Sequence, residues 1–88
     1  MKITEFEWDE WNTEHMAKHA VSCEETEEAC YHRPLIKKSK DGRHLVYGQT
    51  YAGRYLLIVI RYKFKGLVRV ITARDMTQSE QRFFLHRR

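Results

Sequence analysis

The 88-residue sequence predicts one α+β domain in which a small, twisted, mainly antiparallel sheet is packed by helices on one face. Residues 55–64 and 67–74 are rich in β-branched and aromatic residues and are joined by Lys65-Gly66, which is typical of a β-hairpin with a tight turn. Ser22-Cys-Glu-Glu25 and Thr77-Gln-Ser-Glu80 are capping boxes, which mark helix starts. The length supports a single modest core, so residues 1–88 form one predicted domain.

The other elements follow from alternation, composition and turn residues. Residues 3–8 predict a first strand, and residues 9–19 predict a polar helix with Trp11 and His15 on one face. The first capping box starts a second helix that reaches about Tyr31. Pro34, the basic run at residues 37–40 and the turn signal at 41–42 are interpreted as a connection to a strand at residues 44–51. With the hairpin and the last helix, the predicted order is β-α-α-β-β-β-α.

The register of the hairpin follows by counting outward from a two-residue loop. One face is then mostly aliphatic and also holds Tyr62 and Arg69, whereas the other mixes Val and Leu with cations. The predicted pairs are Phe64 with Leu67, Lys63 with Val68, Tyr62 with Arg69, Arg61 with Val70, Ile60 with Ile71, Val59 with Thr72, Ile58 with Ala73, and Leu57 with Arg74. We therefore expect helices to cover the first face and cations to line the second.

Charge is distributed unevenly along the chain. Residues 1–32 hold two Lys against nine Asp and Glu, a net charge of −7, whereas residues 33–88 hold 14 Lys and Arg against three acids, a net charge of +11. The basic part coincides with the predicted sheet, which favours a polyanionic partner such as nucleic acid. The alternative is a solvated basic surface that balances the acidic helices.

Several classes of enzyme and of site find no support in the sequence. It lacks a glycine-rich phosphate loop, a nucleophile elbow and paired carboxylates in apolar surroundings. His15 and His19 have the spacing of two zinc ligands, with Cys23 as a conceivable third, but the glutamate of a metalloprotease is missing. Cys23 and Cys30 lie seven residues apart in one predicted helix, about 10 Å and beyond disulfide reach. We expect no metal and no cofactor. No signal peptide or membrane span is evident, so the expected location is the cytoplasm.

The remaining polar residues suit the cleavage of single-stranded RNA. The 2′-hydroxyl of RNA can attack the adjacent phosphate if a protein positions the chain, moves protons and stabilises the developing charge. Arginine can hold two phosphate oxygens with its planar fork, and His19 is a candidate for proton transfer. Tyr62 and Tyr47 are candidates for stacking on bases or for orienting the phosphate. Each has a structural alternative, since tyrosine suits strands and His19 can satisfy a helix C-terminus.

A set of short motifs in fixed order resembles the BrnT family over nearly the whole chain. The motifs are Phe6-Glu-Trp-Asp9, Asn12, Lys18-His19-Ala-Val-Ser22 with Glu24-Glu25, Pro34, Asp41-Gly-Arg43, Gly48, Gly53-Arg54, Arg69-Val-Ile-Thr-Ala-Arg74 and Glu80. The resemblance implies a small RelE-like ribonuclease toxin of a type II toxin-antitoxin system that inhibits translation and is neutralised by a BrnA antitoxin. The chain departs from the family pattern at Ala20, where glycine is usual, and at Cys23, where phenylalanine is usual.

Residues and resemblance together give a site hypothesis. The predicted catalytic residues are His19, Arg61, Arg69 and Arg74, of which Arg69 is included through the family motif. The predicted RNA-binding residues are Lys18, Arg43, Arg54, Tyr62 and Lys63. The expected partners are RNA and a BrnA-like antitoxin, and the expected activity is metal-independent endoribonuclease cleavage. The rival hypothesis is a non-catalytic nucleic-acid-binding or protein-interaction module, because the sequence alone yields no complete catalytic constellation.

Overall fold

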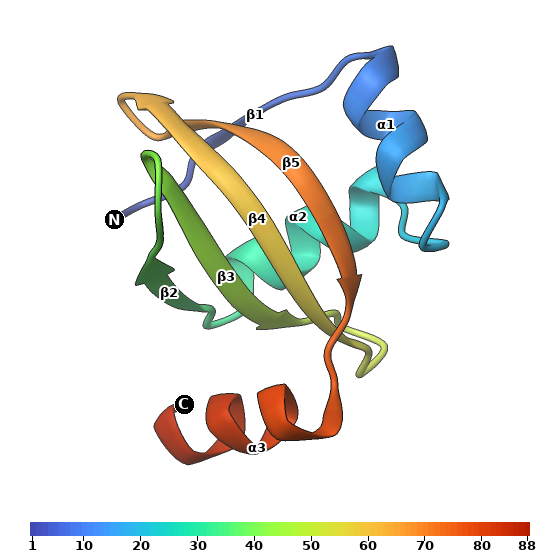
Figure 1. The fold of residues 1–88 in the computed structure, drawn as a ribbon, viewed down its shortest axis with the longest axis vertical. Helices are drawn as coiled ribbons and strands as arrows, with labels where there is room; N and C mark the ends of the chain where they lie inside the picture. Colours follow the sequence, from blue (N-terminus) through green and yellow to red (C-terminus); the bar gives the residue numbers. More distant parts are fainter.

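The computed structural model describes residues 1–88 and contains one five-stranded mixed sheet (Figure 1). The order across the sheet is β1-β5-β4-β3-β2. Only the β1–β5 pair is parallel, and the other three pairs are antiparallel. The strands are β1 (Glu5–Glu7), β2 (Leu35–Lys38), β3 (Arg43–Gln49), β4 (Tyr55–Phe64) and β5 (Leu67–Asp75).

Three helices begin at side-chain caps. They are α1 (Glu10–Ala17), α2 (Cys23–Tyr31) and α3 (Gln78–Arg87). Ser22 and Thr77 cap α2 and α3 through the two predicted capping boxes, and Asp9 with Asn12 forms a third at α1 that we did not predict. Each cap stabilises its helix by about 1 kcal/mol. The α+β prediction and the order of elements are confirmed, with one additional strand, β2.

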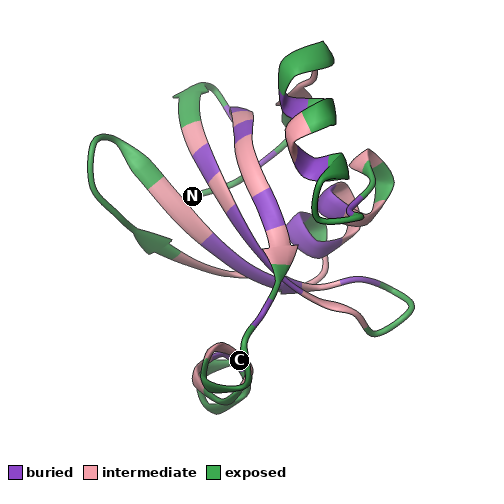
Figure 2. Ribbon diagram, turned by 45° about the vertical axis from the view of Figure 1, so that its right-hand side comes forward, coloured by how far each residue is buried: buried purple, intermediate pink, exposed green.

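The helices lie on both faces of the sheet rather than on one. Helices α1 and α2 cover one face, where the larger core gathers Met16, Leu56, Ile58 and other buried side chains. Leu57 and Tyr47 point to the opposite face, where Phe84 of α3 and Met76 bury them in a smaller second core. We call this second surface the α3 face. Figure 2 shows α3 end-on at the bottom, away from the two other helices, with most of its outer surface exposed.

The predicted hairpin register is wrong in its middle. The turn at Lys65-Gly66 and the outer pairs at Leu57, Ile58 and Val59 are as expected, but the register shifts between Val59 and Ile60 and again between Tyr62 and Phe64. Each shift places an extra residue in one strand, Ile71 in β5 and Lys63 in β4. The observed pairs are Ile60 with Val70, Arg61 with Arg69 and Tyr62 with Val68, which replace the predicted Ile60 with Ile71, Arg61 with Val70, Tyr62 with Arg69 and Lys63 with Val68.

The shift has a packing cause. It turns Val68 and Val70, both fully buried, toward α1 and α2, whereas the predicted register left them on the cationic face. Two fully buried valines thus replace Ile71 and Arg69 on this face, and burial of one such side chain is worth about 1.5–3 kcal/mol on the scale of apolar burial. In exchange Arg69 leaves the aliphatic face and lies beside Arg61.

Strand β2 occupies part of a segment that we had interpreted as a connection. Its four residues pair with β3 from Leu35 against Tyr47 to Lys38 against His44. Four residues that end in two lysines carry little strand signal, and the lysines suit an exposed sheet edge. The turn to β3 uses Asp41 and Gly42, which have φ of 57° and 72°.

Helix α1 is shorter than predicted, so Lys18 is its C-cap and His19 lies in the connection to α2. Ala20 follows with φ of 56°, a left-handed conformation that favours glycine. At Gly48 the chain needs glycine for another reason, because a Cβ there would overlap the backbone carbonyl of Ala29 in α2. None of the three helices is long and apolar enough to cross a membrane.

Candidate functional site

Three arginines lie side by side across three adjacent strands. Arg43 of β3 pairs with Arg61 of β4, and Arg61 pairs with Arg69 of β5. Directly paired residues share a face, and neighbouring strands lie about 4.8 Å apart. We call Arg43, Arg61 and Arg69 the arginine row. It crosses the α3 face at the end of the sheet away from α3, because Leu57 and Tyr47 share that face and α3 covers only their end.

Arg61, the central member of the arginine row, has no carboxylate partner. Its Nη1 donates to the backbone oxygen of Asp41 at 2.9 Å, and this is its only side-chain hydrogen bond. A guanidinium has five N–H donors, so most of them remain available. Arg43 and Lys63 are exposed and make no side-chain hydrogen bond or ion pair. Arg43 and Arg61 thus form the part of the face that is free to meet an anion, and Lys63, the unpaired extra residue of β4, lies two positions from Arg61 in the chain.

Arg69 is instead bound to acidic residues. Its Nη1 donates to Glu7 Oε1 at 3.0 Å and to Asp9 Oδ2 at 2.7 Å, and its guanidinium lies 5.7 Å from the ring centre of Trp11. The Arg69 hydrogen bond is the main cause that lowers the pKa of Asp9. Nη1 is saturated, whereas Nε and Nη2 keep their donors. Sequence reasoning missed this arrangement, because Glu7 and Asp9 lie about sixty positions away in the chain.

Arg74 lies at the other end of β5 and holds a carboxylate of α3. Its Nη1 and Nη2 donate to the two oxygens of Glu80 at 2.8 and 2.9 Å, and Nη1 also donates to Asp75 O at 3.0 Å. The Arg74 hydrogen bonds are the main cause that lowers the pKa of Glu80. Three of the five N–H donors are used. A phosphate can therefore reach Arg74 only through Nε or the second Nη2 hydrogen.

Arg54 has no donor left for a ligand. Nε and Nη2 donate to the two oxygens of Asp75 at 2.7 and 3.1 Å, and Nη1 donates to the carboxylate of Glu25 at 3.2 Å. The last two hydrogens bond the backbone oxygens of His19 and Ala20 at 3.3 and 2.8 Å. All five donors are used inside the protein, so Arg54 ties β4 to the α1–α2 connection and to the end of β5. This geometry supports a structural role and leaves no contact for RNA.

We call Arg54 with Glu25, Asp75 and the backbone oxygens of His19 and Ala20 the clamp. The side chains of His19 and Lys18 are exposed beside it. Hydrogen bonds from Arg54 are the main cause that lowers the pKa of Asp75, and a smaller contribution comes from the nearby His19 charge. Arg69 and Arg74 are five positions apart on β5, roughly 15 Å. The four predicted catalytic residues therefore lie at two ends of the sheet, with Arg61 and Arg69 at one end and His19 and Arg74 at the other.

The aromatic candidates differ in exposure. Tyr47 is buried against Phe83, with ring centres 5.0 Å apart, so its ring is part of the second core. Tyr62 pairs with Val68 on the α1–α2 side, and its hydroxyl accepts a hydrogen bond from Gly66 N at 2.8 Å. His15 stacks on Trp11 with ring centres 4.9 Å apart. The structure assembles no group of three or more His, Cys, Asp or Glu side chains that could hold a metal ion.

A family model described as the ribonuclease toxin BrnT of a type II toxin-antitoxin system matches residues 8–80. The chain belongs to this family. It is accordingly a ribonuclease toxin, and RNA and an antitoxin are its target and its partner. The resemblance drawn from the sequence motifs is thus confirmed, and the ribonuclease hypothesis prevails over the non-catalytic one. No individual curated protein matches the chain.

Family membership gives several structural landmarks a meaning. The BrnT match includes all nine predicted site residues, from Lys18 to Arg74. Other motif positions hold the fold together: Asn12 is fully buried and donates to Glu7 O at 2.8 Å, and Gly48 allows the close approach of α2. Arg54 belongs with these structural positions. In this BrnT chain the motif therefore mixes residues of the scaffold with residues whose side-chain donors are not used inside the protein.

Proposed function

We propose that this BrnT toxin holds RNA on the α3 face of its sheet, with the free donors of Arg61, Arg43 and Lys63 on phosphate oxygens. The observation that carries the proposal is the arginine row, in which Arg61 has no carboxylate partner. Planar guanidinium groups bind phosphates through two parallel hydrogen bonds. The surrounding part of the chain, residues 33–88, has a net charge of +11, which attracts a polyanion at long range.

Cleavage then proceeds without a metal ion, by attack of the RNA's own 2′-hydroxyl on the adjacent phosphorus. The 2′-hydroxyl gives up its proton, a 2′,3′-cyclic phosphate forms, and the departing 5′ oxygen takes up a proton. His19 transfers one of these protons, and the remaining donors of Arg74 stabilise the charge on the phosphoryl oxygens. The RNA strand extends along β5. At one end it meets the arginine row, where Arg69 adds its free Nη2, and at the Arg74 end of β5 it meets Lys18.

The way in which the antitoxin binds follows from the same electrostatics. We infer that the antitoxin is BrnA-like and covers the arginine row with an acidic segment, since this neutralises charge and excludes RNA in one step. The toxin acts in the cytoplasm, where translated RNA is found, and cleavage there inhibits translation. Arginine-specific modification of Arg61 should accordingly be slower in the complex with antitoxin than in the free toxin.

RNA binding by the face is tested with Arg61→Gln and with Arg82→Gln as a matched control on exposed α3. Affinity for a non-cleavable 2′-O-methyl RNA should fall with rising salt, and Arg61→Gln should weaken binding and reduce the slope of log K against log salt by about 0.7. Arg82→Gln should leave both nearly unchanged. Equal slopes for Arg61→Gln and wild type would contradict a phosphate contact at this position.

The catalytic assignment is tested separately from binding. Arg74→Lys keeps the charge but loses the planar fork, so RNA affinity should change little while the cleavage rate falls about 10²-fold. His19→Ala should spare binding and remove one limb of the pH–rate profile. Wild type should arrest bacterial growth, and both variants should be tolerated at equal soluble levels. Full toxicity and wild-type cleavage rates in both variants would refute the assignment while leaving the RNA surface intact.

A further inference from the structure

Phe64 is an exposed aromatic residue that has no role in the core. It is the last residue of β4, at the tip of the hairpin, and 61% of it is exposed. The extra residue Lys63 turns Phe64 to the face opposite Tyr62, where it pairs with Leu67. Because Leu67 and Arg69 are alternate residues of β5, Phe64 lies on the α3 face, one rung of the sheet beyond the arginine row.

The backbone that carries Phe64 is fixed. Lys65 and Gly66 both have positive φ, 48° and 85°, as a tight hairpin turn requires. Gly66 N donates to the hydroxyl of Tyr62 at 2.8 Å, and its oxygen accepts from the backbone N–H groups of Thr4 and Glu5 at 2.9 and 3.2 Å. The tip is thus anchored to the first strand as well as to its own hairpin. A ring on such a backbone loses little conformational entropy when a ligand covers it.

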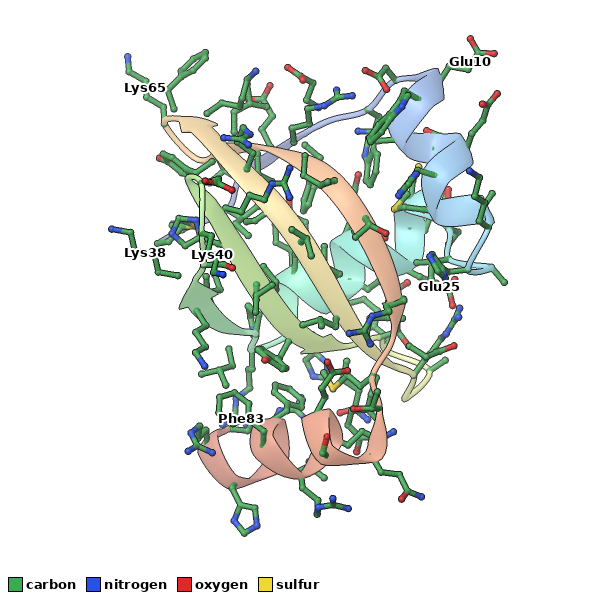
Figure 3. All side chains as sticks on the ribbon, in the orientation of Figure 1. Glu10, Glu25, Lys38, Lys40, Lys65 and Phe83 are labelled. Carbon is green, nitrogen blue, oxygen red and sulfur yellow. The ribbon has the colours of Figure 1, made fainter.

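The surroundings of Phe64 suit an anionic ligand with a flat apolar part. Lys63 and Lys65 flank it in sequence and both are exposed, and Arg61 lies on the same face. Figure 3 shows Lys65 at the hairpin tip, at the opposite end of the molecule from Phe83 on α3. The exposed ring does not contribute to the stability of the folded state, because apolar surface in contact with water is unfavourable.

Trp11, another exposed aromatic residue near the arginine row, offers a contrast. Its ring stacks on His15 and lies against the guanidinium of Arg69, which is held by Glu7 and Asp9. The ring is thus already occupied, and the neighbouring carboxylates repel phosphates. The hairpin tip has neither obstacle.

We propose that Phe64 is a stacking platform for an unpaired base of the RNA substrate, with the phosphates next to that base on Arg61 and Lys63. The proposal rests on the RNA surface described above and adds a contact to the base, which phosphate-binding cations do not supply. Stacking on an aromatic side chain tolerates every base, because each has a π-face. Phe64 therefore sets where a base lies and does not select which base it is.

The test compares two short 2′-O-methyl oligonucleotides with the intact toxin: an oligoadenylate, and the same backbone with abasic residues. The 2′-O-methyl group removes the nucleophile, so binding is measured without cleavage. Phe64→Leu should lower the affinity for the oligoadenylate about tenfold and leave the affinity for the abasic oligomer unchanged. Phe64→Trp should retain wild-type affinity for both, because indole also stacks. Tyr51→Leu is the matched control, since Tyr51 is also an exposed aromatic residue, at 70%, but lies beyond the other end of the hairpin.

The outcomes separate the platform from the RNA surface. Wild-type affinity of Phe64→Leu for the oligoadenylate, or an equal loss for both oligomers, overturns the platform. Weaker antitoxin binding with unchanged oligoadenylate affinity also overturns it, since the ring is then a protein contact. Arg61→Gln, in contrast, should weaken both oligomers. If it weakens both while Phe64→Leu weakens neither, the surface stands and the platform is wrong.

Discussion

Removal of Arg54 should destabilise the fold strongly although the residue lies near the surface. Its side chain is 26% exposed, and the carboxylates of Glu25 and Asp75 are 33% and 63% exposed. The Asp75 pair, mostly in water, contributes only about 0.5 kcal/mol. The bonds to Glu25 and to the oxygens of His19 and Ala20 are charge-assisted, and the Glu25 bond is partly buried; together they contribute about 2–3 kcal/mol. We therefore expect Arg54→Ala to cost about 3 kcal/mol.

Urea unfolding followed by circular dichroism measures this loss, with Arg82→Ala as the control for removing an exposed arginine. A cost of about 3 kcal/mol corresponds to a fall of roughly 12–24 °C in Tm for a domain of this size. Arg82→Ala should lie within about 0.5 kcal/mol of wild type. Arg54→Lys should recover less than half of the loss, since an ammonium cannot bridge four acceptors in a plane. If Arg54→Ala and Arg82→Ala unfold at the same urea concentration, the clamp does not stabilise the fold.

The clamp should also make stability depend on pH. Hydrogen bonds from Arg54 are the main cause that lowers the pKa of Asp75, and a hydrogen bond from Ser22 N, followed by Arg54, lowers that of Glu25. A carboxylate whose folded pKa lies below its unfolded pKa stabilises the fold above about pH 4 and loses this contribution as the pH falls. The difference in unfolding free energy between wild type and Arg54→Ala should therefore be largest near pH 7 and shrink below about pH 4. A difference that is constant from pH 7 to pH 3 would contradict the ion pairs.

Two further predictions concern single residues. Ala20→Gly should stabilise the protein by about 0.5–1 kcal/mol, because relief of the strain at positive φ outweighs the greater conformational entropy of glycine in the unfolded chain. A stability in urea that is equal to or lower than that of wild type would contradict this prediction. The Cys30 thiol, whose pKa burial raises to about 12, should react with iodoacetamide far more slowly than half-buried Cys23, and equal labelling of the folded protein at pH 8 would refute this.

Local signals in the sequence were sufficient for much of the fold. The hairpin turn, the caps at Ser22 and Thr77 and the strand content of residues 55–64 depend on neighbours within four positions, and all were predicted correctly. The concentration of cations on the sheet also followed from counting charges. Such features are set by local backbone preferences, which one sequence displays directly.

The parts that were missed depend on distant partners. No sequence signature marks Ile71 as an extra residue, because its position depends on which valines pack in the core. The shift at Ile71 places Arg69 opposite Arg61. The carboxylates that bind Arg54 and Arg69 lie more than twenty positions away, so sequence distance hid the difference between a structural arginine and a free one. The site residues themselves stay predictions, and among the three predicted catalytic arginines only Arg61 has no carboxylate partner.

The parallel pairing of β1 with β5 has a consequence for how the toxin is made. Strand β1 leaves the ribosome first, but its only partner in the sheet is the last strand to be synthesised. Contacts between such distant segments form late, because a long loop must close before they stabilise anything. The bonds from Thr4 and Glu5 to the hairpin tip and from Glu7 to Arg69 form with it. A nascent chain therefore completes the proposed RNA surface only after β5 has been made.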